Sequence, residues 1–273
     1  MRPLEELPHR FWPKDRLPEG VKPRSKFSNQ KIAKLKSAYG KAVSPVLRAE
    51  GFRCVGTKGS RQQDWLWQGT WLLGGKYGGK AWILMCAHPP GFPARNEYEV
   101  RAPFEVPQCL FKRTVRFFDG PSGDEFDLGT AAETPETVAI MAEAVAADGL
   151  AYLSRLENAR ERLLSVTAET YDTLMPETHT ELGLSVTDSA FEDSERARLE
   201  LCLFLLRIHR EAGTDAVRGL ADAGLAAFDQ QPELRGTKHY LTRILLERLP
   251  SGGPLHATDE EKQAAEAAWR ADQ

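Results

Sequence analysis

Cys86 and His88 are a thiol and an imidazole separated by one residue, a pair that can ligate zinc or act as nucleophile and base. A structural zinc site usually has two close ligand pairs, and even with Cys54 and Cys109 nearby this chain supplies half of one. On a strand the two residues share a face about 7 Å apart, without a third group to orient the histidine. We therefore interpret the cysteines as buried free thiols and assign no metal ligand.

A group of carboxylates suggests a second chemistry, a divalent-ion site of the kind that metal-dependent nucleases use, with Lys80 or Lys112 as the positive partner. Two of these carboxylates alternate with apolar residues as a solvent-facing strand does, and the others lie in a turn-like loop. We therefore keep a metal-dependent hydrolase only as an alternative. The carboxylates are Glu97, Glu99, Asp124, Glu125 and Asp127.

Aromatic and basic residues alternate between residues 65 and 80, a pattern that can stack on single-stranded nucleic acid. The residues are Trp65, Trp67, Trp71, Lys76, Tyr77 and Lys80. The competing interpretation is that three Trp side chains on one strand face pack beneath a helix. We favour core packing, because large aromatic side chains contribute most when buried.

The net charge of −3 conceals an uneven distribution. Residues 1–80 hold 17 Lys and Arg against 6 Asp and Glu, whereas the remainder holds 19 against 33. A basic N-terminal third attracts nucleic acid or an acidic protein, although the two ends of one chain can also neutralise each other. We place candidate binding residues in the first helix, the turn after Trp71 and the loop after residue 87: Lys31, Lys34, Lys41, Lys76, Lys80, His88 and Arg95.

The stretch from Asp64 to Phe92 is the densest apolar and aromatic part of the chain and predicts two strands. In the first, Trp65, Trp67, Trp71 and Leu73 share one face. The second, residues 81–87, is apolar on both faces and is expected at the centre of a sheet. The glycines between the strands indicate a tight turn, because a phosphate-binding loop would end in Gly-Lys-Ser/Thr and precede a helix.

Helices are predicted on both sides of this sheet. The first begins at Ser28 or Asn29, bends or restarts at Pro45 and ends at Gly51, with Phe52 making the apolar contact of the helix end. Further strands are expected at residues 52–56, 98–104 and 110–118. The later helices are expected from Thr134 with Pro135 at its first position, then at residues 150–173, 188–213, 215–228 and 238–249, with a connection at 176–188, a linker at 251–254 and a terminal helix capped by Thr258 and Glu261.

These elements predict an α+β fold: a small antiparallel sheet with flanking helices, followed by an all-helical C-terminal part. The predicted organisation is a basic Pro-rich arm (1–28), an α+β domain (29–173), a helical-hairpin domain (188–250) and a linker with a terminal helix (251–273).

The order of a helix ending in Leu47-Arg-Ala-Glu-Gly-Phe52, a Trp-rich strand pair, an edge strand at 113–118 and a helix at 150–156 resembles a family of bacterial domains of unknown function. The resemblance covers about residues 32–165. Some such domains lie near toxin–immunity loci, which implies a binding protein, and the family supplies no catalytic residues.

We therefore expect a non-enzymatic protein-interaction factor, immunity-like or regulatory, in a bacterial cytoplasm, with a protein partner and no cofactor. A nucleic-acid-associated protein is the alternative, and the metal-dependent hydrolase is the third. The apolar runs are shorter than the roughly 18 residues that a membrane span needs, and the N-terminus lacks the apolar core of a signal peptide, so no membrane association is expected. The scattered cysteines favour reduced thiols in the cytoplasm. The oligomeric state is not determined by the sequence.

Overall fold

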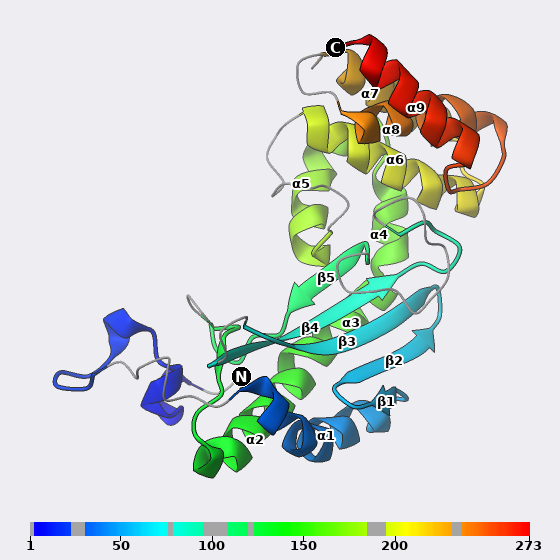
Figure 1. The fold of residues 1–273 in the computed structure, drawn as a ribbon. Helices are drawn as coiled ribbons and strands as arrows, with labels where there is room; N and C mark the ends of the chain where they lie inside the picture. Colours follow the sequence, from blue (N-terminus) through cyan, green and yellow to red (C-terminus); the bar gives the residue numbers. More distant parts are fainter. Residues whose placement is uncertain are drawn as a thin grey trace. The chain divides into compact units, whose positions relative to one another are not determined.

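The computed structural model describes residues 3–22, 31–75, 79–94, 109–119, 123–184, 195–230 and 236–273. Within these ranges the strands form one six-stranded antiparallel sheet, flanked by helices and followed by a helical part, which confirms the predicted α+β class. The chain forms two compact units (Figure 1). Unit 1 comprises Met1–Ala87 and Lys112–Arg155, and unit 2 comprises His88–Phe111 and Leu156–Gln273.

Unit 1 opens with three short 3-10 turns and contains nearly the whole sheet, whose strand order is β1-β2-β3-β4-β5 with β6 beside β4. Figure 1 places α1, α2 and α3 on one side of this sheet. The elements are the turns Leu4–Glu6, His9–Phe11 and Lys14–Arg16, then α1 (Ile32–Ala49), β1 (Arg53–Val55), β2 (Lys58–Gln63), β3 (Leu66–Gly74), β4 (Lys80–His88), β5 (Phe111–Thr114), β6 (Phe126–Asp127), a 3-10 turn (Ala131–Glu133), α2 (Thr134–Ala144), a π turn (Val145–Gly149) and α3 (Leu150–Glu157).

Unit 2 is helical over most of its described residues. In it α6 packs against α7 and α8, and α9 packs against α8. Its elements are α4 (Ala159–Ser165), α5 (Tyr171–Leu182), α6 (Glu195–Ala212), α7 (Val217–Gln230), α8 (Thr237–Arg248), a 3-10 turn (Leu249–Ser251) and α9 (Asp259–Ala271).

The predicted hairpin is present as β3 and β4, and the Gly75 amide donates to the Lys80 carbonyl across their turn at 3.0 Å. A strand missed in the sequence, β2, pairs with β3 over six residues. Its sequence, Lys-Gly-Ser-Arg-Gln-Gln, lacks the apolar alternation that marks a strand, so only pairing with its neighbours reveals it.

The prediction that the Trp residues of β3 pack in a core is confirmed for Trp67, which is buried, but α1 covers the other face of the strand. Thr70 lies on the helix side: a Cβ added at its strand partner Gly59 would lie 2.9 Å from Thr70 Cγ2 and 3.4 Å from Leu47 Cδ1 of α1. By alternation, Trp67 and Trp71 occupy the opposite face. Trp71 is only half-buried, with the Lys58 ammonium 4.5 Å from its ring centroid. The face beneath α1 also carries polar Gln68, which is paired with Arg61, and Thr70, whose hydroxyl has no hydrogen-bond partner among the described residues.

The predicted end of α1 is confirmed. Gly51 adopts φ 81°, its amide donates to the Arg48 carbonyl at 3.0 Å, and the Phe52 amide donates to the Leu47 carbonyl at 3.1 Å. This pair of bonds satisfies the last helical carbonyls, and Phe52 is buried. The helix does not restart at Pro45, and its first residue follows Lys31, which makes no side-chain cap bond. Ser28 and Asn29 lie outside the described residues.

Several predicted boundaries differ in the structure. Thr130 rather than Thr134 begins the α2 segment, since the Glu133 carboxylate accepts from the Thr130 amide at 2.7 Å. The strand predicted at 110–118 ends at Thr114, because the Phe117 amide turns to the Gly123 carbonyl. The strand predicted at 98–104 and the start of the helix predicted at residue 188 lie outside the described residues.

The connection predicted at 176–188 is wrong, because α5 continues through Pro176 to Leu182. The helix predicted at 150–173 is interrupted after Glu157 and again at 166–170. Burial of Met175, Thr178 and Leu182 on one face of α5 explains why packing overrides the local preference against proline. The capping box of α9 is confirmed, with Thr258 and Glu261 exchanging side-chain and backbone bonds.

Gly149 ends the π turn that joins α2 to α3, and it lies against the sheet. A Cβ at Gly149 would lie 3.1 Å from Val115 Cγ2 and 3.2 Å from Met85 Cγ. In the same turn the buried Asp148 carboxylate accepts from the Arg116 amide at 2.8 Å and from Arg113 Nη2 at 3.0 Å. The π turn therefore fixes the chain that follows β5.

Ala131–Glu157 is long and apolar enough to cross a membrane by length and composition, and more than half of its most apolar part is buried inside the protein. Core helices of soluble proteins pass the same test, so this stretch gives no membrane assignment.

Replacing Asp148 by Ala is expected to lower the free energy of unfolding by about 2 kcal/mol, because it leaves the Arg116 amide without its acceptor and Arg113 without its counter-ion. The exposed Glu161 of α4, replaced by Ala, is the control and should change stability by less than about 0.5 kcal/mol. Urea unfolding of both variants checks this, and equal effects would contradict the role given to Asp148.

Candidate functional site: the basic face of α1

Three cations on α1 form what we call the α1 basic row: Lys34, Lys41 and Arg48. All three are exposed. They are seven residues apart, which brings each within about 20° of the previous one around the helix and about 10.5 Å further along it. The three charges therefore lie nearly in a straight line.

The fold presents this row to solvent because the opposite side of α1 is committed to the core. Leu35, Tyr39, Val43 and Leu47 are buried, at the four-residue spacing of one helix face. With these residues packed on the sheet, positions 34, 41 and 48 must face outward. The sequence motif and the packing together determine where the charge lies.

The α1 basic row has no ion pair with any described residue. Residues 21–49 contain eight Lys or Arg and no Asp or Glu, so the helix carries no counter-ion of its own. Glu50, the first carboxylate after it, lies 4.0 Å from Arg61. In unit 2, by contrast, several exposed or half-exposed cations are matched with carboxylates: Arg162, Arg198, Arg243 and Arg270 each form an ion pair.

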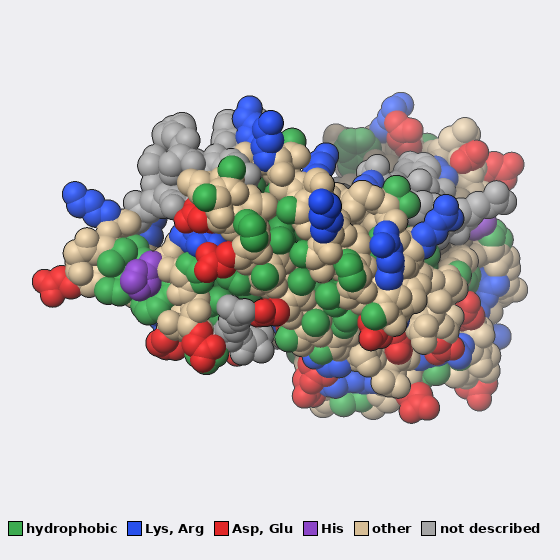
Figure 2. All heavy atoms as spheres, turned by 90° about the horizontal axis from the view of Figure 1, so that it is seen from below, with side chains coloured by type: hydrophobic (Ala, Val, Ile, Leu, Met, Phe, Trp, Pro, Cys, Tyr) green, Lys and Arg blue, Asp and Glu red, His purple; other side chains and the backbone are tan. Residues whose placement is uncertain are grey.

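Figure 2 shows the molecule from below, the side on which α1 and α2 lie in Figure 1. Lys and Arg side chains stand apart from one another on this face, with apolar side chains between them. Lys31, which directly precedes α1, and Lys36 within it are also exposed. A face of this kind attracts an anionic surface rather than a single small anion, since no two cations converge on one point.

The structure does not bring the other predicted binding residues into this face. Lys80 begins β4 and forms an ion pair with Glu125. His88 is buried in unit 2, and its ring Nε2 lies 3.2 Å from the Phe92 carbonyl. Lys76 and Arg95 lie outside the described residues. Of the seven candidates, Lys34 and Lys41 lie on α1 and Lys31 directly precedes it. Arg48 is the cation that the prediction missed, although its seven-residue spacing from Lys41 is visible in the sequence.

Of the five carboxylates considered for a metal site, two have other partners and two lie outside the described residues; Asp124 is described and half-buried. Glu125 pairs with Lys80, and Asp127 Oδ1 accepts from the Gly129 amide at 2.8 Å. Glu97 and Glu99 are not among the described residues. Over the described part of the chain, no group of three His, Cys, Asp or Glu side chains is placed to hold a metal ion.

Cys86 is buried on the sheet beside Gly69, where an added Cβ would lie 3.0 Å from its Sγ. Burial lowers the pKa of His88 to about 4, against the raising effect of its bond with the Phe92 carbonyl. His88 is therefore neutral at pH 7 and donates from Nε2 to that carbonyl. This position gives the imidazole a structural role.

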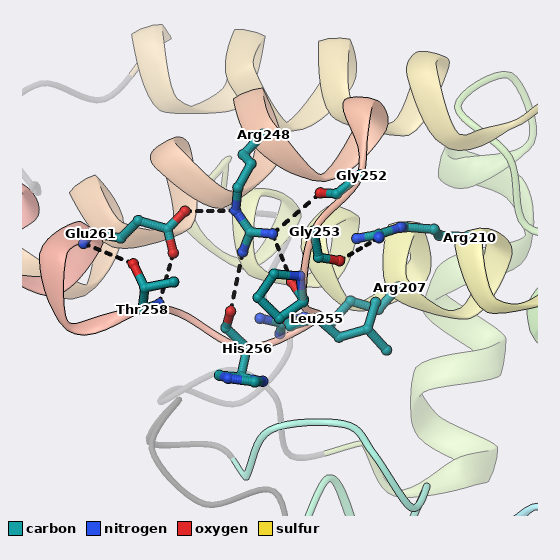
Figure 3. Close-up of polar contacts among 10 residues, drawn as sticks. Arg207, Arg210, Arg248, Gly252, Gly253, Leu255, His256, Thr258 and Glu261 are labelled. Carbon is teal, nitrogen blue, oxygen red and sulfur yellow. Dashed lines mark hydrogen bonds and ion pairs between the residues drawn. The ribbon is translucent and has the colours of Figure 1, made fainter.

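A second concentration of cations, in unit 2, is built differently (Figure 3). Arg248 at the end of α8 donates to the Glu261 carboxylate at 2.6 Å, to the Pro254 carbonyl at 2.7 Å and to the His256 carbonyl at 3.1 Å. From α6, Arg207 donates to the Leu255 carbonyl at 2.9 Å and Arg210 to the Gly253 carbonyl. These guanidinium groups bind the segment that the sequence predicts as a linker.

The glycines of this segment make the arrangement possible. Gly252 and Gly253 adopt φ 125° and 88°, and a Cβ at Gly253 would lie 2.6 Å from Arg248 Nη1. A side chain there would displace the guanidinium. Desolvation, together with the nearby Arg248, lowers the pKa of Arg210. The cations hold α9 to α8, so this cluster is structural, unlike the α1 basic row.

Comparison of the chain with known proteins gave no match, whether to a protein-family model, to a curated protein or to a solved structure.

Replacing Arg248 by Lys is expected to destabilise the protein by about 2 kcal/mol, because an ammonium cannot reach Glu261 and the loop carbonyls together. Arg243→Lys is the matched control on α8, since Arg243 is exposed and its ion pair is with Glu247 on the same helix. Thermal unfolding and hydrogen exchange of α9 report the difference. Equal behaviour of the two variants would show that the loop does not depend on Arg248.

His88 is expected to make the protein less stable in mild acid. The unfolded imidazole titrates near pH 6.5 and the folded one near 4, so between these values the unfolded chain binds more protons. Stability should be constant above pH 6.5 and fall by up to about 3 kcal/mol as the pH drops to 4. His88→Gln should remove this pH-dependent loss of the free energy of unfolding, which is measured by urea unfolding at each pH. His256→Gln, at a half-exposed site, should leave it in place.

Proposed function

We propose that this chain is a non-enzymatic binding protein, immunity-like or regulatory, whose α1 basic row binds an acidic surface of a partner protein. The observation that carries the proposal is that three exposed cations stand in line on one helix without an ion pair to any described residue. Exposed like charges raise the energy of the isolated protein slightly, and an acidic partner relieves this.

The shape of the site supports a macromolecular partner. The cations extend over fourteen residues of helix, about 21 Å, which is longer than a small ligand and is a usual length for one side of a protein interface. The resemblance of residues 32–165 to bacterial domains found near toxin–immunity loci points the same way. Charges at such an interface chiefly increase the association rate and the specificity.

Nucleic acid is the second candidate, because a row of unpaired cations is also what a phosphate backbone attracts. Three contacted phosphates would give a slope of about −3 in a plot of log affinity against log salt concentration. The acidic remainder of the chain, with 33 Asp and Glu against 19 Lys and Arg beyond residue 80, makes a protein interface the better-supported candidate.

Reversing the charge of the row, with Lys34→Glu, Lys41→Glu and Arg48→Glu together, is expected to weaken partner capture at least about tenfold, since each lost pair becomes a repulsion. The control reverses three exposed cations elsewhere, Lys14, Arg155 and Arg218, and so produces the same net charge. Circular dichroism verifies that both variants are folded.

The readout is quantitative recovery of the stoichiometric protein partner from the native host, identified by mass spectrometry. Equal loss in both variants would mean that net charge, and not this row, governs binding. Unchanged recovery with the α1 variant would contradict the proposal. Recovery of nucleic acid with a salt slope near −3 would support the second candidate.

A further inference from the structure

We propose that the partner presents an α-helix to α1, with Asp or Glu side chains repeating every seven residues along it. This inference rests on the proposed function and specifies the surface that the α1 basic row recognises. The geometry points to it through the spacing of the cations, the size of the side chains between them and the straightness of the row.

The spacing matches that of a second helix. Lys34, Lys41 and Arg48 are each separated by seven residues, about 10.5 Å along α1. Any α-helix rises by the same amount per residue, so carboxylates at a seven-residue repeat on a helix lying along α1 reach all three cations at once. Charged residues flanking paired helices use this repeat to select their partners.

The residues between the cations leave room for a helix to approach. On the same side of α1, Ser37 and Pro45 are exposed and Ala38 is half-exposed. None of the three has a long side chain, so little projects from the helix between the longer Lys and Arg side chains. Helices pack with their axes about 8–10 Å apart, and small residues between charged ones permit that distance. The cations then border the contact and the small residues form its floor.

A duplex fits this row less well. One strand of B-DNA advances about 3.4 Å per nucleotide, so successive cations are about three base pairs apart. Over three base pairs the strand turns by roughly 100° about the duplex axis, since a turn takes about 10 base pairs. A straight row of cations cannot follow one DNA strand around this turn. A partner α-helix is itself straight, so it can lie along the whole row of cations.

The test uses the full chain and synthetic peptides of about 21 residues, three heptads long. The first peptide has three Glu at seven-residue spacing in an Ala- and Gln-rich helical host, and the second has the same composition with the Glu distributed around the helix. A short DNA duplex is the third probe. Because exposed ion pairs are individually weak, binding is followed by NMR titration at low salt, which detects millimolar affinities.

The expected result is that the heptad peptide shifts the resonances of α1 and binds at least about fivefold more tightly than the shuffled one. Lys41→Glu should abolish this preference, and a peptide whose middle Glu is Lys should restore it. Lys14→Glu, an exposed cation in the N-terminal arm, should leave it unchanged. A restored charge pair is a result that general destabilisation cannot produce.

The failures are distinguishable. If the shuffled peptide binds as tightly as the heptad peptide, the helical spacing is overturned and the acidic protein partner stands. If the duplex shifts α1 and neither peptide does, the row binds nucleic acid, and both the helix and the protein partner are overturned. If none of the probes shifts α1, the row is not a binding site.

Discussion

The packing of α1 against α2 and the sheet is the contact on which the arrangement of unit 1 depends. Two glycines allow its close approach to the strands: a Cβ at Gly59 would lie 3.4 Å from Leu47 Cδ1, and one at Gly74 would lie 2.8 Å from Ile32 Cγ2. Because the helix rests against backbone at these points, its rotation about its own axis is fixed. The outward direction of the α1 basic row follows from that rotation.

Polar residues lie on the inner face of the sheet beneath α1. Gln68 accepts from Arg61 Nε at 2.7 Å, whereas the buried Thr70 hydroxyl and the buried Tyr39 phenol of α1 have no hydrogen-bond partner among the described residues. Burial raises the pKa of Tyr39, so its hydroxyl keeps its proton and can donate. Burying a hydroxyl without a partner costs free energy, so the apolar packing of α1 must offset the cost of Tyr39 and Thr70.

Two groups of cations, one in each unit, differ in what they contact. In unit 2, Arg207, Arg210 and Arg248 turn toward backbone carbonyls and bind a glycine-containing segment (Figure 3). In unit 1, the cations of α1 face solvent. A guanidinium that donates to several fixed carbonyls stabilises the fold, whereas an exposed ammonium without a counter-ion contributes little to stability. This contrast underlies the structural role of the first group and the binding role that we propose for the second.

The sequence by itself determined the features that depend on neighbouring residues. Gly51 ends α1, Thr258 and Glu261 begin α9, the alternation of residues 66–74 predicts a strand, and the spacing of Lys34 and Lys41 is part of the primary structure. Each follows from backbone conformation or from a period that a single element imposes.

Only the tertiary structure decided which elements cover each face of the sheet. Periodicity shows that Trp67 and Trp71 share a side, but not that α1 packs on the side of Gln68 and Thr70. The polar strand β2, the helix through Pro176 and the loop held by Arg248 likewise depend on partners distant in sequence. The preference of a single residue for helix or strand amounts to about 1–3 kcal/mol, and burial of side chains against residues distant in sequence outweighs it. Which distant residues meet is not visible in the linear sequence.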